Sequence, residues 1–279
     1  MSTHRPNRSF VSLRVLRVIP LTPRMIRVTF VGDPPFPLID AGPDQCTKVL
    51  FPPGPDQPVT LPPRETTDTE ITWYRRYLAM PDELRPPMRT YTIRAQRPEL
   101  NELDIDFVLH PGHAGPGSDW AATAAPGDEV GLLYPAHVLY CPPPEAQWQL
   151  LIGDETALPA IAAIIERLPT DTPVHAFIEV TDSADHLRFA DANTTHIEWV
   201  HRGNRPRGEA VLAALRTAHL PEGPPYAWIS GEADLVKHTR RHLITDRGID
   251  KRTITFTGYW RQGTTEEENG RERIRREVT

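Results

Sequence analysis

The chain has 279 residues, enough for two modest domains. Its 39% hydrophobic and 24% charged content is typical of a soluble globular protein, and its net charge of -6 argues against nucleic acid as the main partner. No stretch approaches the roughly 18 apolar residues of a membrane-spanning helix, and no signal-peptide pattern is visible, so we expect a cytoplasmic protein.

The first half of the chain reads as short strands. Residues 10–31 form two runs of alternating apolar and polar residues around a proline-containing turn, which predicts a hairpin at the edge of a sheet. Further strands are predicted over Lys48–Phe51, Thr90–Ile93, Leu103–Leu109 and Val130–Tyr134. An antiparallel β-barrel is the natural closure of roughly six such strands. Residues 52–87 are rich in proline and predict a surface excursion, apart from a short helix over Ile71–Met80.

The second half alternates strands with helices. Strands are predicted over Trp148–Ile152, Val174–Val180, Thr195–Val200, Tyr226–Ser230 and Thr253–Thr257, and helices over Thr156–Leu168, Glu209–Leu220 and Ala233–Asp246. This order predicts an α/β domain with a doubly wound parallel sheet. Prolines in Cys141–Gln147 mark the boundary. We therefore expect a barrel domain over 1–143, the α/β domain over 144–262 and a charged tail over 263–279, either a solvated helix or disordered.

A barrel followed by a parallel sheet is the order of a flavin reductase, and the segment Arg89–Arg94, RTYTIR, suits a flavin. On a strand, Arg89, Tyr91 and Ile93 share one face, and the residues between them share the other. A tyrosine ring can lie along an isoalloxazine, a threonine can bond a ring nitrogen, and arginine suits a pyrophosphate. Spacing alone fits equally well a sheet edge with surface arginines and a half-buried tyrosine.

RTYTIR resembles the RxYTxR flavin signature of the siderophore-interacting protein family, a branch of the ferredoxin-reductase-like flavoproteins. Further stretches resemble the same family, in family order across almost the whole chain: DFVLHPGHAGPGSDWA (106–121), GDETALPAI (153–161), SGEA (230–233) and GYWRQGTTEE (258–267). Together they are far more specific than any one of them.

The resemblance implies FAD as the cofactor, with NADH or NADPH as the hydride donor. It assigns cofactor contacts to residues of these motifs: Arg89, Tyr91, Thr92, Arg94, Asp106, Val108, His110, Gly115, Gly117, Ser118, Thr156, Ala157, Tyr259 and Trp260. The glycine-rich turn before Ser118 enters a helix, whose free N–H groups stabilise a diphosphate. The chain departs from the family at Gly117, where alanine is common, and Asp119 adds a negative charge nearby.

The segment Gly153–Thr156 follows the first parallel strand, where ligands bind in open α/β sheets. The resemblance places it by the flavin and nicotinamide rings, and it also reads as a helix cap. The choice of nicotinamide stays open. Asp182 and Asp185 favour a free ribose hydroxyl, whereas arginines after the next strand suit a 2′-phosphate: Arg202, Arg205 and Arg207.

A flavin turns a two-electron hydride into single-electron steps, and ferric iron accepts one electron at a time. The resemblance therefore implies an FAD-dependent ferric-siderophore reductase that needs no catalytic acid or base and no protein ligand to the metal. Two distant cysteines, Cys46 and Cys141, are too few for a disulfide framework or a thiolate metal site. Lys48 and Arg261 are candidates for binding an anionic ferric siderophore, or are ordinary surface charges.

Two alternatives remain at this stage. One is a general flavin or ferredoxin-type reductase, with the same cofactors but a protein or free flavin as acceptor. The other is a siderophore-binding module that has lost turnover. We expect a monomer, and a ferredoxin is a possible electron donor.

Overall fold

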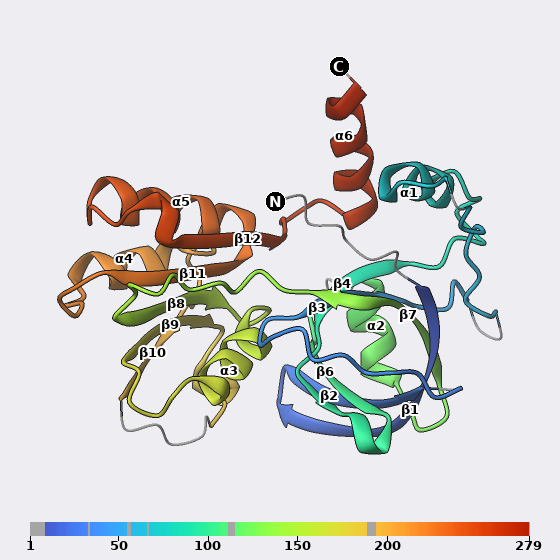
Figure 1. Cartoon of the computed structure of the whole chain (residues 1–279), viewed down its shortest axis with the longest axis horizontal. Coiled ribbons are helices and arrows are strands. Elements are labelled where there is room, and N and C mark those ends of the chain that lie inside the picture. The colour runs from blue at the N-terminus through green and yellow to red at the C-terminus, as the bar shows by residue number, and fades with distance from the viewer. Residues whose placement is uncertain are drawn as a thin grey trace.

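We describe the protein from a computed structural model, which covers residues 9–32, 34–54, 57–65, 67–110, 115–188 and 194–278. The chain forms two bodies side by side, the antiparallel barrel of the first half and the parallel sheet of the second (Figure 1). The last helix stands apart from the parallel sheet, close to helix α1 of the first half. No helix in these ranges is long and apolar enough to cross a bilayer.

The first domain is one seven-stranded sheet in the order β4-β3-β7-β1-β2-β6-β5, with every pair antiparallel. Its strands are β1 (Ser9–Thr22), β2 (Met25–Gly32), β3 (Cys46–Leu50), β4 (Met88–Thr92), β5 (Ala95–Arg97), β6 (Glu102–Val108) and β7 (Glu129–His137). The chain between β4 and β5 rejoins β6, since Arg94 N donates to Asp104 O at 2.8 Å. This closes the sheet around a buried apolar core and confirms the predicted barrel.

The hairpin over residues 10–31 exists, but its predicted place at the sheet edge is wrong. β1 pairs with β2 on one side and with β7 on the other, and β2 pairs with β6. Alternating polarity shows only that one face of a strand is solvated. A central strand of a barrel also has one solvated face, so the pattern could not distinguish the two positions.

The proline-rich segment before β4 also differs from its prediction. The expected helix is present as α1 (Glu70–Leu78). However, Trp73 and Tyr77 of α1 are buried against Leu50, Met88 and neighbouring apolar side chains, so the segment builds a second small core on the barrel. The Tyr77 hydroxyl donates to Pro86 O at 2.8 Å. Since Pro86 lies just before β4, this packing fixes the start of that strand.

The second domain is a five-stranded parallel sheet in the order β10-β9-β8-β11-β12. Its elements are β8 (Trp148–Asp154), α3 (Leu158–Arg167), β9 (Val174–Val180), β10 (Thr195–His201), α4 (Glu209–Thr217), β11 (Pro225–Glu232), α5 (Ala233–Thr245) and β12 (Ile254–Trp260). Helix α3 covers one face, and α4 and α5 cover the other. The doubly wound sheet is therefore confirmed, with its switch point between β8 and β11.

Three short 3-10 turns and two longer helices complete the described chain. The turns are η1 (Pro98–Leu100), η2 (Ser183–Asp185) and η3 (Lys251–Thr253), and the helices are α2 (Pro116–Thr123) in the barrel domain and α6 (Glu266–Val278) in the tail. α6 lies against α1, with Gly270 next to the Tyr74 ring. The tail is thus a helix that packs on the barrel, and not a freely solvated one.

Polar contacts join the two domains. Trp228 Nε1 of β11 donates to Asp44 Oδ2 at 3.0 Å, and both residues are buried. Arg24, in the turn between β1 and β2, bonds Asp182 at 3.0 Å and Asp185 at 2.7 Å. These contacts hold β11 and the turn after β9 against the first domain.

Candidate functional site

Strand β4 carries the RTYTIR segment, and its two faces behave as the alternation predicts. Tyr91 and Ile93 pack against the barrel core, where the Tyr91 ring lies 4.5 Å from that of Phe107. Burial raises the pKa of the Tyr91 hydroxyl. Thr92 is buried and points the other way, toward the second domain, where its side chain lies beside that of Tyr259. The strand thus presents one face to the barrel and the other to the domain junction.

Helix α2 begins at a glycine-rich turn. Its N-cap is Gly115, and none of the described side chains caps the helix start. A Cβ added at Gly115 would meet nothing within 4 Å, whereas one at Gly117 would overlap the Tyr91 hydroxyl. Ser118 Oγ accepts a hydrogen bond from His110 N at 2.9 Å and keeps its own proton to donate. An uncapped helix start with open space and a free hydroxyl fits a diphosphate, and hence FAD.

The second domain meets β4 at the end of β12. The Tyr259 hydroxyl lies beside the side chains of Ser230 of β11 and Thr92 of β4, and burial raises the pKa of that hydroxyl. Its ring also packs edge-on against Trp228, with centroids 6.4 Å apart. Tyr259 therefore connects the barrel strand of the flavin signature with the carboxyl edge of the parallel sheet.

Asp154, at the carboxyl end of β8, organises that edge. Its Oδ1 accepts from Thr156 N at 2.9 Å, and its Oδ2 accepts from Glu232 N at 2.8 Å and Trp260 Nε1 at 3.1 Å. Burial, then the charge of Glu155, raises the pKa of Asp154 to about 6. The predicted cap is wrong in its form: the N-cap of α3 is Ala157, without a side-chain hydrogen bond, and Asp154 instead closes a turn with Thr156 before the helix. Sequence analysis did not foresee that the same carboxylate fixes Trp260.

Arginines lie above this edge. The Arg207 guanidinium stacks over the Trp260 ring at 4.6 Å from its centroid and donates to Glu155 Oε1 at 2.7 Å. Arg202 lies 3.5 Å from the same oxygen. Burial opposes ionisation of Glu155, but Arg207 holds its pKa below the usual value. Two of the three arginines considered for a 2′-phosphate are thus gathered at the switch point.

The two acids considered for a ribose hydroxyl are engaged by the barrel domain. Asp182 and Asp185 bond Arg24 of the barrel, so they serve the contact between domains. Glu179, in contrast, is buried at the end of β9, where it accepts from Gly208 N at 2.9 Å. Burial raises the pKa of Glu179 to about 7.

Several residues named from the flavin motifs are committed to protein contacts. Arg94 forms an ion pair with Glu166 of α3, across the domain junction. Asp106 is buried, and its two carboxylate oxygens accept hydrogen bonds from Nε and Nη2 of Arg27. Val108 and Ala157 pack with the core of the second domain. His110 lies near Trp260, with ring centroids 6.2 Å apart, and burial lowers its pKa.

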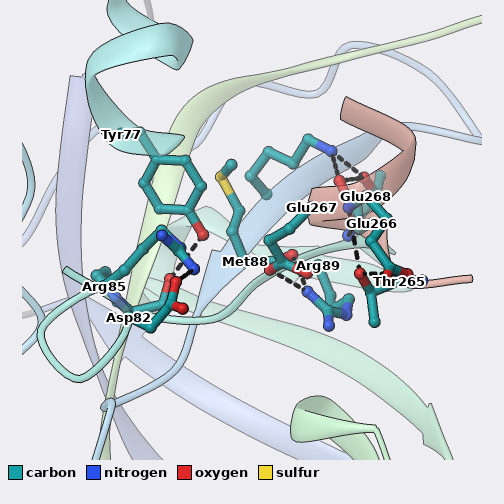
Figure 2. Close-up of polar contacts among 12 residues, drawn as sticks. Tyr77, Asp82, Arg85, Met88, Arg89, Thr265, Glu266, Glu267 and Glu268 are labelled. Atoms are coloured by element: carbon teal, nitrogen blue, oxygen red, sulfur yellow. Dashed lines mark hydrogen bonds and ion pairs between the residues drawn. The ribbon is translucent and has the colours of Figure 1, made fainter. Parts of the chain in front are cut away.

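The other named cations fall into two groups. Lys48 and Arg89 face glutamates of α6, as Figure 2 shows for Arg89 and Glu267. Arg261 is exposed just after β12, and no hydrogen bond or ion pair with a described residue engages its side chain. Sequence analysis predicted the tail as either a solvated helix or disordered, without contacts to the barrel. The run of three glutamates after two threonines was the signal for a capped helix start.

Comparison with known proteins agrees with this geometry. A family model described as siderophore-interacting FAD-binding domain matches residues 14–139, and one described as siderophore-interacting protein matches residues 146–263. The chain is 32% identical over 257 residues to the ferric vibriobactin reductase ViuB of Vibrio cholerae, covering 89% of this chain and 88% of that protein. It is 31% identical over 255 residues to the NADPH-dependent ferric-chelate reductase of Escherichia coli, covering 90% and 92%.

A solved structure is similar over nearly the whole chain. The crystal structure of a siderophore utilization protein from T. fusca is 36% identical, with a TM-score of 0.78, and the match covers 93% of this chain and 95% of that one. Both domains and their order are thus those of one known group of proteins. The chain belongs to the siderophore-interacting protein family and carries its FAD-binding domain.

Proposed function

We propose that this protein is a ferric-siderophore reductase of the cytoplasm. It takes a hydride from a nicotinamide cofactor onto FAD and passes single electrons to two ferric chelates. When bound, the flavin supplies the conversion from one two-electron donor to two one-electron acceptors. Ferrous iron is held less tightly than ferric iron by hard oxygen ligands, so reduction releases the metal.

One observation carries the proposal: Tyr259, at the end of β12, lies beside Thr92 of the flavin-signature strand and beside Ser230 of the parallel sheet. A hydride can pass between two cofactors only if they lie in contact, and the two domains meet at this tyrosine. The uncapped start of α2 supports a place for the FAD diphosphate on the barrel side. We propose that Arg89, Tyr91, Thr92 and Ser118 bind FAD there, and that the other residues of the flavin motifs shape the pocket.

On the other side of the junction, we propose that the nicotinamide cofactor lies above the ends of β8 and β11. The grouping of cations favours NADPH. Arg202 and Arg207 lie together at this edge around Glu155, whereas Asp182 and Asp185 are paired with Arg24 of the barrel. Both sets have partners within the chain, so it is the closeness of two guanidinium groups that favours a 2′-phosphate. A 2′-phosphate needs cations, and a free ribose hydroxyl needs an acceptor. A related protein is named for NADPH dependence.

The division into domains at residues 143 and 144 stays our proposal. It falls between the two segments matched by the family models.

Anaerobic stopped-flow spectroscopy tests the function. The protein is loaded with FAD, reduced with NADPH or NADH, and mixed with a ferric tris-hydroxamate. We expect bleaching of the flavin by NADPH faster than by NADH, and reoxidation by two equivalents of ferric chelate. A flavin that NADPH reduces but no ferric chelate reoxidises would reject ferric reduction and leave a general flavin reductase.

A further inference from the structure

The first turn of α6 reaches back to the flavin-signature strand. Figure 2 shows Glu266 and Glu267 projecting from α6 toward β4. Glu266 forms an ion pair with Lys48 of β3, and its Oε2 accepts from Thr90 N at 3.2 Å. Lys48 Nζ also donates to Thr90 Oγ1 at 2.7 Å. Glu267 bonds Arg89 at 2.5 Å. Two cations proposed for anionic ligands therefore each face a carboxylate of the chain itself.

These contacts differ from ordinary surface pairs. The Lys48 and Glu266 side chains are 25% and 24% exposed, and those of Arg89 and Glu267 are 20% and 14% exposed. Thr90 N lies on the side of β4 away from β3, ahead of the point where the chain rejoins β6, and the Glu266 carboxylate accepts its hydrogen bond. Partial burial and shared hydrogen bonds make such a pair stronger than the exposed pairs typical of surfaces.

The third glutamate of the turn has a different task. Glu268 Oε2 accepts from Thr265 N at 2.8 Å, and Glu268 N donates back to Thr265 Oγ1 at 3.2 Å. This is a capping box, which starts the helix. Helix initiation is thus assigned to Glu268. It leaves the contacts of Glu266 and Glu267 with the barrel unexplained by helix formation alone.

We propose that Glu266 is a specificity residue that selects the ferric chelate by its charge, an inference that rests on the proposed function. Lys48 of β3 pairs directly with Thr90, which lies on the flavin-signature strand β4. Lys48 and Arg261 are the two cations that we proposed for binding the ferric chelate. Because Glu266 neutralises Lys48, only the positive charge of Arg261 remains without a carboxylate partner among the described residues. A site of this balance accepts neutral or singly charged chelates, such as ferric tris-hydroxamates. It disfavours ferric tris-catecholates, which carry three negative charges.

Binding of redox-inert Ga³⁺ chelates tests the charge preference without electron transfer. The FAD-loaded protein is dialysed to equilibrium against neutral gallium tris-hydroxamate and trianionic gallium tris-catecholate at low ionic strength. We expect Glu266→Gln to tighten binding of the trianion about tenfold, which is the Coulomb effect of one charge on three at about 10 Å in water. Binding of the neutral chelate should change less than about twofold, and the gain should fade at high salt.

Two variants control for fold and for total charge. Glu268→Gln removes the same charge from the same turn, and glutamine also completes a capping box. Because Glu268 bonds Thr265 and Glu266 bonds Lys48, the trianion should gain clearly less in Glu268→Gln than in Glu266→Gln. Lys48→Gln should act in the opposite direction and weaken the trianion about tenfold. Equal changes for both chelates in Glu266→Gln, or an equal effect of Glu268→Gln, would overturn the assignment.

The same variants are then mixed, reduced, with the ferric forms of both ligands. A charge preference in gallium binding without reoxidation of flavin by either ferric chelate would sink the proposed function and leave the role of Glu266 intact. If the ferric chelates reoxidise the flavin, but Glu266→Gln changes neither the ratio of their reoxidation rates nor gallium binding, the role of Glu266 is overturned and the proposed function stands.

Discussion

Asp154 and Trp260 meet at the switch point of the parallel sheet, where the indole Nε1 donates to Asp154 Oδ2 at 3.1 Å. The two residues end β8 and β12, the first and last strands of the sheet along the chain. The same carboxylate also bonds Thr156 and Glu232. One fully buried side chain therefore sets the position of the aromatic residue that faces Arg207.

We predict that Asp154→Asn destabilises the protein by about 2–4 kcal/mol. One carboxylate oxygen becomes an amide NH₂ group, which cannot accept a hydrogen bond, so buried N–H groups that now donate to Asp154 lose their acceptor. Trp260→Phe removes only one of these donors and should cost about 1 kcal/mol or less from this bond. Urea unfolding of both variants checks the difference. Equal losses in the two would contradict a central role for the carboxylate.

Glu179 predicts a pH dependence of stability. Its pKa is about 7 in the folded protein, against an ordinary value of 4.5, because burial disfavours the charged form. Between these values the native state binds more protons than the unfolded chain, so the free energy of unfolding falls as pH rises from about 4.5 to about 7. Glu179→Gln lacks this titration. Relative to wild type it should therefore gain about 1–3 kcal/mol between pH 5 and pH 8.

Urea unfolding at the two pH values measures that gain. The exposed Glu222→Gln, in a loop before β11, is the control, and its difference from wild type should be the same at both pH values. A constant difference for Glu179→Gln as well would show that Glu179 titrates normally.

Arg89→Ala should weaken FAD binding while leaving the fold intact. Arg89 lies on the flavin-signature strand, and a charge-assisted hydrogen bond to a phosphate contributes about 1.5–3 kcal/mol, equivalent to a rise of about 10- to 100-fold in the dissociation constant. Flavin titration of the apoprotein measures it, and circular dichroism checks the fold. Arg17→Ala is the matched control, since Arg17 is also a barrel arginine paired with a glutamate. Unchanged flavin occupancy in Arg89→Ala would refute its assignment.

Gly117→Ala tests the packing at the start of α2. An added Cβ would overlap the Tyr91 hydroxyl, so the tyrosine must shift at a cost of about 1–3 kcal/mol of stability. Gly115→Ala, two residues earlier, meets open space and should cost about 0.5–1 kcal/mol, because alanine is a poorer N-cap than glycine. Thermal unfolding of the apoproteins compares them. A Gly117→Ala variant as stable as Gly115→Ala would mean that Tyr91 moves freely.

Most of the architecture could be predicted from the sequence, because strands and helices leave local periods in it. The strands over Val174–Val180 and Thr195–Val200 agree with β9 and β10 within a residue. The motifs also indicated the family, since their order along the chain does not depend on packing. What failed was relative position: alternation could not tell a central strand from an edge strand, and proline content hid the small core under α1.

The sequence by itself determined the type and order of the elements, the two sheets and the flavin-signature strand. Only the tertiary structure decided which charges meet. Glu266 lies 218 residues from Lys48, Asp185 lies 161 from Arg24, and Asp44 lies 184 from Trp228. Periodicity and propensity are set by neighbours in the chain, whereas the partner of a charged side chain depends on how whole elements pack. The identity of the partner of Lys48 was therefore beyond any local pattern.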